Sequence, residues 1–249
     1  MDDSKNISPI LNNPYEEPQF HYDSTLDGNL DYTKVLPGRR PYMANLNVLP
    51  NGNIQKELFN NSDMPVDESG NAAFINGIRD AVKTWREKEY PMVTKVTKDL
   101  LNFWFCNPER ELNRSLFFCQ REAVETAIWL NEVATRDPNI GRSVLYELQQ
   151  RRESIDASYA DVLPRTAFKM ATGTGKTVVM AMLILYHYLN KKEYHQDVRF
   201  ADHFLIVAPG ITIRDRLGVL YIDEGSRNDA ESIDYYHQRD LIPAKYEMQ

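Results

Sequence analysis

Residues 169–177 read KMATGTGKT, and this stretch decides how the fold of the chain is interpreted. The segment that leads into it, 166–170, is short and largely apolar, which suits a buried strand of an α/β sheet. The segment that follows, 176–189, is apolar on nearly every side, as expected for a helix packed closely against a sheet. A strand, a tight glycine-containing turn and a helix form the context in which a phosphate-binding loop occurs.

The residue types in the turn match the chemistry of a bound triphosphate. Gly173 and Gly175 allow the backbone to wrap with its N–H groups converging on one point, and the following helix adds the positive end of its dipole. Lys176 is expected to contact the β- and γ-phosphates, and Thr177 to hold Mg²⁺ through its hydroxyl, so these two are the candidate catalytic residues. The predicted site for ATP and Mg²⁺ is a run of consecutive residues: Ala171, Thr172, Gly173, Thr174, Gly175, Lys176 and Thr177.

Met170 departs from the usual pattern G-x-x-x-x-G-K-[ST], which begins with glycine. This position closes the strand side of the loop, and its side chain need not face the phosphates. The alternative interpretation is a glycine- and threonine-rich turn with an incidental lysine. The apolar segments on both sides of the turn favour the phosphate-binding loop.

Composition limits the class of protein. A hydrophobic content of 42% is enough for a core, and the net charge of −7 argues against a dedicated nucleic-acid coat while allowing a local basic groove. Cys106 and Cys119 lack metal-binding or redox spacing and are interpreted as packing residues in a reduced compartment. The N-terminus lacks an apolar signal region, and the longest apolar run, 178–186, is far shorter than the roughly 18 residues of a membrane span. We expect a cytoplasmic protein with no membrane contact.

Composition also divides the chain. Residues 1–70 are predicted to be an irregular acidic N-terminal segment, with short strands around 42–48, and residues 71–130 a helical region. Residues 131–164 turn polar and are interpreted as an insertion or linker. Residues 165–249 form the predicted, partial ATP-binding lobe.

Apolar periodicity predicts three helices within the helical region. The first begins near Asn71 and ends before Pro91, and the second runs from Val93 to Trp104. The third carries an apolar stripe from Leu116 to Leu130. Packing between helices is the expected use of their aromatic side chains.

At this point the sequence resembles a known family. The stretch MATGTGKT from Met170 is similar to motif I of superfamily-2 helicases, especially the motor subunits of type I and type III restriction enzymes. The segment LFFCQREA at 116–123 resembles the upstream glutamine-containing segment of these proteins, and FLIVAPGITIRDRL at 204–217 resembles the strand and turn of motif Ia. Residues 72–105 and DYYHQRDLIPAKY at 234–246 also look like parts of type III restriction Res-subunit-like helicases.

The resemblance implies a fold and partners. The fold would be α/β, an incomplete RecA-like P-loop lobe preceded by a helical region and an irregular N-terminal segment. Gln120 would pair with the adenine edge through its amide, and the polar insertion would loop out between Gln120 and the phosphate loop. Thr212, Arg214 and Arg216 would touch a nucleic-acid backbone, although surface ion pairing is an equally good use of the arginines. The implied partners are double-stranded DNA and a DNA-modification subunit.

A helicase ATPase also needs an Asp-Glu pair, with the aspartate toward Mg²⁺ and the glutamate toward the attacking water. The candidate here is Asp223-Glu224, which follows motif Ia too closely, so a loop is the favoured interpretation. The chain is therefore expected to resemble the N-terminal portion of a DNA-dependent ATPase, a helicase or translocase of restriction type, that stops before this motif. By itself it is expected to bind nucleotide weakly and hydrolyse it slowly or not at all. The alternatives are a non-catalytic nucleotide-binding fragment and a P-loop phosphotransferase of another class.

Overall fold

The computed structural model describes residues 10–24, 30–42, 68–155, 166–222 and 234–247. The chain divides into two compact units, 1–81 and 82–249, and each is described by itself. None of the helices in these described ranges combines the length and the apolar character needed to cross a lipid bilayer.

The first unit contains a β-hairpin that the sequence interpretation missed. Strand β1 (Phe20–Ser24) pairs antiparallel with β2 (Leu30–Pro37), and the register shifts between Tyr22 and Asp23. The segment lacks a clear alternation of apolar and polar residues. The two strands also contact each other through the rings of Tyr22 and Tyr32, whose centroids are 5.1 Å apart. The interpretation of 1–70 as irregular is therefore wrong for this part. Beyond residue 42, the short strands expected around 42–48 lie outside the described residues.

The helical region follows the predicted pattern. Helix α1 (Glu68–Glu87) ends before Pro91, α2 (Lys95–Phe105) begins after the N-cap Thr94, and α3 (Phe118–Ile128) continues into a π-helical turn, η2 (Trp129–Val133). The side chain of Thr94 accepts a hydrogen bond from the backbone N–H of Thr97, which satisfies one of the free amides at the start of α2. The three helices predicted from periodicity are confirmed.

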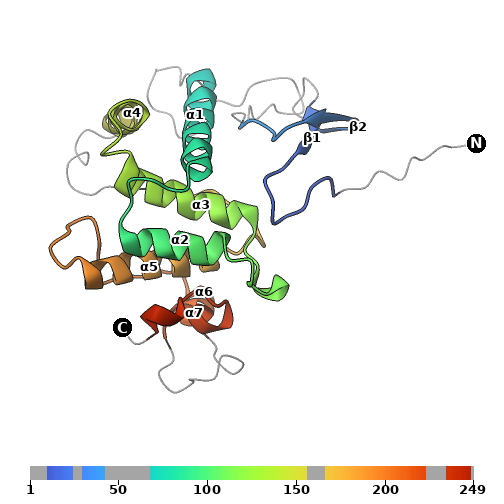
Figure 1. Cartoon of the computed structure of the whole chain (residues 1–249). Helices are drawn as coiled ribbons and strands as arrows, with labels where there is room; N and C mark the ends of the chain where they lie inside the picture. The colour runs from blue at the N-terminus through green and yellow to red at the C-terminus, as the bar shows by residue number, and fades with distance from the viewer. Residues whose placement is uncertain (1–9, 25–29, 43–67, 156–165, 223–233, 248–249) are drawn as a thin grey trace, which may run out of the picture. The chain divides into compact units, whose positions relative to one another are not determined.

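The core of the second unit lies where α2, α3 and α5 (Lys176–Glu193) pack together (Figure 1). Helix α5 is the predicted helix after KMATGTGKT, and it is confirmed. It was expected to pack against a sheet, but it buries its apolar face against two helices instead. The largest fully buried apolar side chains of this core are Leu100, Leu101, Trp104, Val124, Ile128, Trp129, Met182 and Tyr186.

The predicted strands on both sides of α5 are wrong. Residues 166–170 form no strand, and Phe168 is 36% exposed rather than buried. Residues 204–208 also lie outside any sheet, with Leu205 90% and Val207 81% exposed. A parallel strand is stable only when neighbouring strands satisfy its backbone and helices cover both faces. Among the described residues, these two segments have neither.

Part of the segment expected to be a polar linker is helical. Helix α4 (Ile140–Ile155) lies within 131–164 and keeps Val144 buried. Residues 132–134, at the start of that segment, are also buried, because the π turn continues α3 beyond its expected end. The boundary at residue 131 therefore falls inside a helix rather than at the edge of a linker.

Short elements complete the second unit. They are η1 (Leu112–Arg114), α6 (Ile211–Arg216), η3 (Leu217–Leu220), α7 (Tyr235–Gln238) and η4 (Ala244–Tyr246). The C-terminal residues 234–247 are hydrogen-bonded to α2: the indole N–H of Trp104 donates to the carbonyl oxygen of Leu241 at 2.8 Å. Arg110 donates to the carbonyl oxygens of Arg239 and Asp240 at 3.1 and 2.6 Å. These bonds explain why DYYHQRDLIPAKY lies against the helical core.

His187 on α5 gives the fold a predicted pH dependence. Its ring contacts those of Tyr186, Phe200 and Phe204, its Nδ1 atom is buried without a hydrogen-bond partner, and burial lowers its pKa below 6.5. Because the unfolded chain then takes up this proton at a higher pH than the folded one, stability falls as the pH drops below about 6.5.

We expect His187→Phe to reduce the difference between the thermal unfolding midpoints at pH 7.5 and pH 5.0. The phenyl ring keeps the aromatic packing and removes the group that titrates. The same substitution at the exposed His195 is the control and should leave the difference unchanged. An unaltered difference in His187→Phe would show that another group controls the acid sensitivity.

Candidate functional site

The predicted phosphate loop has the backbone conformation that its glycines allow. Gly173 and Gly175 adopt φ values of 80° and 76°, in the left-handed region where other residues are strained, and Gly175 is the N-cap of α5. Helix α5 begins at Lys176. The tight turn therefore delivers the chain directly into the positive end of a long helix, the arrangement that attracts anions.

Polar contacts inside the loop hold it closed on itself. The Nζ atom of Lys176 donates to the carbonyl oxygens of Met170 and Ala171 at 3.0 and 2.8 Å. The hydroxyl of Thr174 also donates to the carbonyl oxygen of Ala171, at 2.7 Å. Lys176 is exposed and Thr177 is half-buried. In this conformation the ammonium group of Lys176 bonds to two backbone carbonyl oxygens of its own loop.

Gln120, predicted from the resemblance, lies against this loop. Its Nε2 atom donates to the carbonyl oxygen of Thr174 at 3.0 Å, and its Oε1 atom accepts from the backbone N–H of Phe117 at 2.9 Å. The side chain is buried, and a Cβ atom on Gly175 would come within 2.2 Å of Nε2. Gln120 and the loop are therefore in contact although they are far apart in the sequence. One amide hydrogen and one oxygen lone pair of Gln120 remain for a further partner.

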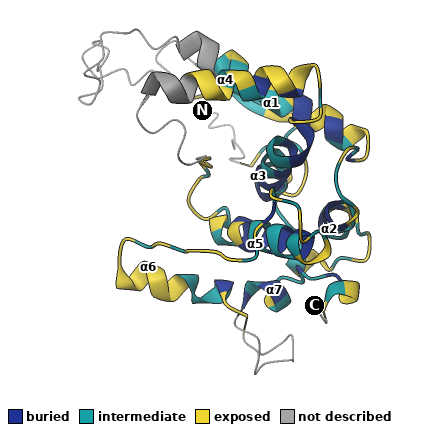
Figure 2. Cartoon of the chain, turned by 90° about the vertical axis from the view of Figure 1, so that its left-hand side faces the viewer, coloured by how far each residue is buried: buried dark blue, intermediate teal, exposed yellow. Residues whose placement is uncertain are grey.

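The predicted nucleic-acid contacts lie apart from these polar contacts, on the short helix α6. Thr212, Arg214 and Arg216 are all exposed, as the yellow colour of α6 shows in Figure 2. Arg214 forms an ion pair with Asp215 at 3.0 Å, and both side chains are mostly exposed. Such a surface pair contributes little to stability and yields easily to a phosphate.

Asp223-Glu224 lies outside the described residues, so the structure gives no position for either carboxylate. Within the described ranges, no group of three or more His, Cys, Asp or Glu side chains is arranged to hold a metal ion.

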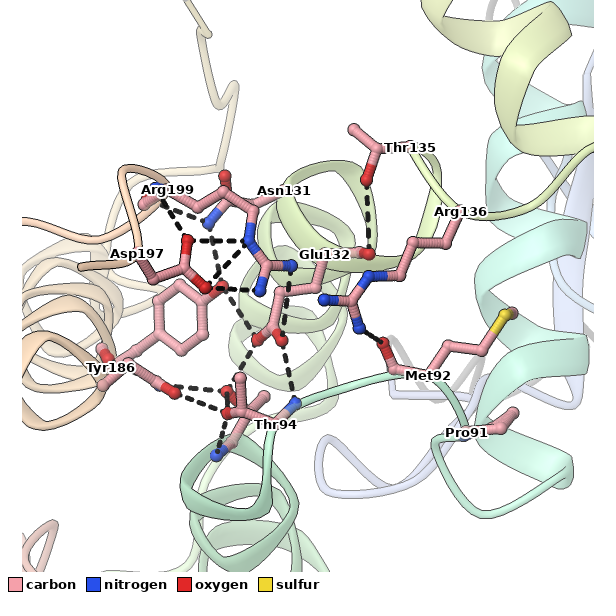
Figure 3. A network of polar contacts seen from close by, with 12 residues as sticks. Pro91, Met92, Thr94, Asn131, Glu132, Thr135, Arg136, Tyr186, Asp197 and Arg199 are labelled. Carbon is pink, nitrogen blue, oxygen red and sulfur yellow. Dashed lines mark hydrogen bonds and ion pairs between the residues drawn. The ribbon is translucent and has the colours of Figure 1, made fainter. Parts of the chain in front are cut away.

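A buried polar network connects helix α5 to its neighbours, and the sequence did not predict it (Figure 3). Glu132 on the π turn accepts hydrogen bonds from the backbone N–H of Thr94 at 2.9 Å, from the Thr97 hydroxyl at 2.6 Å and from the Tyr186 hydroxyl at 3.1 Å. Asn131 donates to the same tyrosine hydroxyl at 2.9 Å. The sequence signal that could have indicated this network is Glu132 itself, a charged residue within the largely apolar run that follows α3.

A second buried glutamate serves a different part of the unit. Glu125 on α3 accepts hydrogen bonds from Arg86, Arg121 and Tyr90, the closest at 2.6 Å. Burial and the adjacent carboxylate raise the pKa of Tyr90, which keeps its hydroxyl protonated as a donor. These partners come from α1, α3 and the turn after α1, and none of them belongs to α5.

The residues of the loop fit a magnesium-bound triphosphate by their chemistry. Gly173 and Gly175 adopt left-handed φ values, the N-terminus of α5 supplies positive potential, and Lys176 supplies a full charge within the same turn. The hydroxyl of Thr177 is the hard oxygen ligand that Mg²⁺ accepts. Gln120 contributes the amide that can recognise a base.

Comparison with known proteins agrees with this arrangement. A family model described as type III restriction enzyme, res subunit, matches residues 115–245, a range that includes Gln120, the loop and α6. No curated protein and no solved structure matches the chain. Because the family match covers more than half of the 249 residues, the chain belongs to the type III restriction enzyme, res subunit, family.

Proposed function

We propose that this chain is the ATP-binding portion of a DNA-dependent ATPase, a helicase or translocase of restriction type. The observation that carries the proposal is the left-handed glycine turn that leads into α5 with Lys176 at its start and Gln120 against its backbone. Membership of the family implies a RecA-like fold and an ATP-dependent, helicase-like character for the matched residues. In finer terms, we propose a RecA-like P-loop lobe preceded by a helical region.

Each residue of the loop has a proposed role. Lys176 releases the carbonyl oxygens of Met170 and Ala171 and pairs with the β- and γ-phosphates, exchanging two neutral acceptors for charged ones. Thr177 holds Mg²⁺ through its hydroxyl. When bound, Mg²⁺ neutralises charge on the phosphate oxygens during phosphoryl transfer. The backbone of 171–175 supplies the remaining donors.

Gln120 is proposed to bind the adenine edge while it stays in contact with the loop. Its amide is bonded to Thr174 through one hydrogen, so the second hydrogen and the second lone pair can face N7 and N6 of the base. A single side chain then contacts both the base and the loop that surrounds the phosphates. This use of Gln120 requires a small displacement, because the side chain is only 5% exposed.

The proposed polymer partner is DNA, double-stranded, bound through Thr212, Arg214 and Arg216. These residues share one exposed turn, and guanidinium and hydroxyl groups suit phosphate oxygens. A DNA-modification subunit as a further partner is proposed from family membership alone, and a cytoplasmic location is proposed from the sequence.

The test is equilibrium binding of magnesium-ATP to the 249-residue chain, followed by ATP turnover with and without duplex DNA. We expect measurable nucleotide binding and little turnover. Robust DNA-stimulated turnover would assign a catalytic role to Asp223-Glu224 or to a partner. Absence of any nucleotide binding by the folded chain would contradict the proposal.

The same assay separates the two alternatives. A P-loop phosphotransferase would transfer the γ-phosphoryl group to a small-molecule acceptor, which is detected as a phosphorylated product rather than free phosphate. A non-catalytic nucleotide-binding fragment would bind ATP with no turnover, and added DNA would not change its affinity for ATP.

A further inference from the structure

The segment that carries Gln120 and Glu132 contacts the loop and helix α5 at two positions, which are called the first and second level below. At the first level, Nε2 of Gln120 donates to the carbonyl oxygen of Thr174 at 3.0 Å. At the second, the Tyr186 hydroxyl donates to Oε1 of Glu132 at 3.1 Å. Both contacts connect positions 54 residues apart in the sequence. The equal offset shows that the two segments run in the same direction at these two contacts.

The π turn makes this double contact possible. The backbone N–H of Ala134 donates to the carbonyl oxygen of Trp129 at 2.8 Å, five residues earlier. In an uninterrupted α-helix, Gln120 and Glu132 would point about 120° apart around the axis. The π turn holds more residues per turn than an α-helix and therefore reduces this angle. Both side chains thus reach the continuous segment formed by the loop and α5, Gln120 at Thr174 and Glu132 at Tyr186.

The carboxylate of Glu132 is surrounded by donors and fully buried. Besides Tyr186, it accepts from the backbone of Thr94 and the hydroxyl of Thr97, and Arg199 lies 4.0 Å away (Figure 3). A buried carboxylate is costly whenever one of its donors moves away, so it favours a single arrangement of the elements around it. Those elements are the start of α2 and the middle of α5.

A second side chain on α5 reinforces the same level. Asn190 donates to the Thr97 hydroxyl at 2.9 Å, and the Thr94 hydroxyl donates to its amide oxygen at 2.5 Å. Asn190 lies one turn beyond Tyr186 on the buried face of α5. Sliding or rotation of α5 would break the bonds to Tyr186 and to Asn190 together.

We propose that Glu132 is a positioning residue for the nucleotide site: it sets the register of α5 so that Gln120 meets the backbone of the phosphate loop. The inference rests on the proposed nucleotide-binding function. Glu132 touches neither the loop nor Gln120 and acts through α5.

The test measures the affinity for a fluorescent ATP analogue with Mg²⁺, and the thermal unfolding midpoint, in the 249-residue chain. Glu132→Gln is expected to weaken nucleotide binding about fivefold to tenfold at a temperature where the variant is fully folded. In a Gln120→Ala background the same change is expected to alter the affinity less than about twofold, because the contact that it positions is gone. Equal losses in both backgrounds would show a merely structural role and overturn the inference.

Two further variants keep the test decisive. Tyr186→Phe removes only the hydroxyl and serves if Glu132→Gln fails to fold, and the same dependence on Gln120 is expected. Glu125→Gln is the matched control, since it alters the buried glutamate of α3, whose partners Arg86, Tyr90 and Arg121 lie outside α5. It should lower the unfolding midpoint and leave the nucleotide affinity within about twofold. An equal loss of affinity in the control would overturn the inference.

The outcome for Lys176→Ala separates this inference from the proposed function. If that variant loses nucleotide binding while Glu132→Gln does not, the positioning role fails and the proposed function stands. If Lys176→Ala binds as well as the unaltered chain, the proposed function itself fails.

Discussion

Lys176→Ala is expected to lower the affinity of the chain for magnesium-ATP by about thirtyfold or more, because removing one partner of a charged, hydrogen-bonded contact typically costs about 2–5 kcal/mol. In the nucleotide-free chain the ammonium group only bonds to the carbonyl oxygens of Met170 and Ala171. Those bonds are exposed, so their loss should leave the thermal unfolding midpoint nearly unchanged. The measurement is isothermal titration with ATP and Mg²⁺.

The control for this variant is Lys192→Ala, which removes the same charge from the other end of α5. Lys192 lies in the last turn of the helix, with its ammonium group 5.1 Å from the Tyr188 ring centroid. We expect its affinity for magnesium-ATP to stay within about twofold of the unaltered chain, since a lysine there cannot reach the loop. Equal weakening by the two variants would indicate that net charge, rather than the loop, controls binding.

The helices could be predicted from the sequence because their signal is local. The stripe that includes Trp85 on α1 and the one that includes Trp104 on α2 repeat with the helical period, and both residues are buried. Pro91 and the N-cap Thr94 mark the ends within the same few residues. A strand cannot be predicted from local signals in this way, because its backbone N–H and C=O groups need hydrogen-bond partners on another strand. The apolar run at 166–170 therefore predicted a strand that the described structure does not contain.

The loop could be predicted for the same reason as the helices. Two glycines and a lysine at fixed spacing before an apolar helix specify a conformation without reference to distant residues, and Gly173 and Gly175 do adopt left-handed φ values. The position of Gln120 came only from resemblance. Glu132 could not be found, because a glutamate in a helix usually faces solvent. Its burial depends on a π turn that interrupts the period on which the prediction relied.

Gly175→Ala is expected to be the most damaging single change to the nucleotide-free loop. Its φ of 76° places a new Cβ in a left-handed conformation that costs roughly 1–2 kcal/mol. The Cβ would also lie 2.2 Å from Nε2 of Gln120, so this side chain must move and give up its bond to Thr174, a loss of about 1 kcal/mol. Together they predict a destabilisation of about 2–3 kcal/mol, measured by chemical unfolding without nucleotide.

Gly173→Ala provides the matched comparison. Its φ of 80° imposes the same backbone strain, but a Cβ there meets no atom within 4 Å. The extra cost of Gly175→Ala over Gly173→Ala therefore measures the displacement of Gln120. This extra cost should disappear in a Gln120→Ala background, where the new methyl group has room, while the strain common to both glycines persists. If it remained, the collision would involve the loop backbone, and Gln120 would not be the side chain that holds the loop in place.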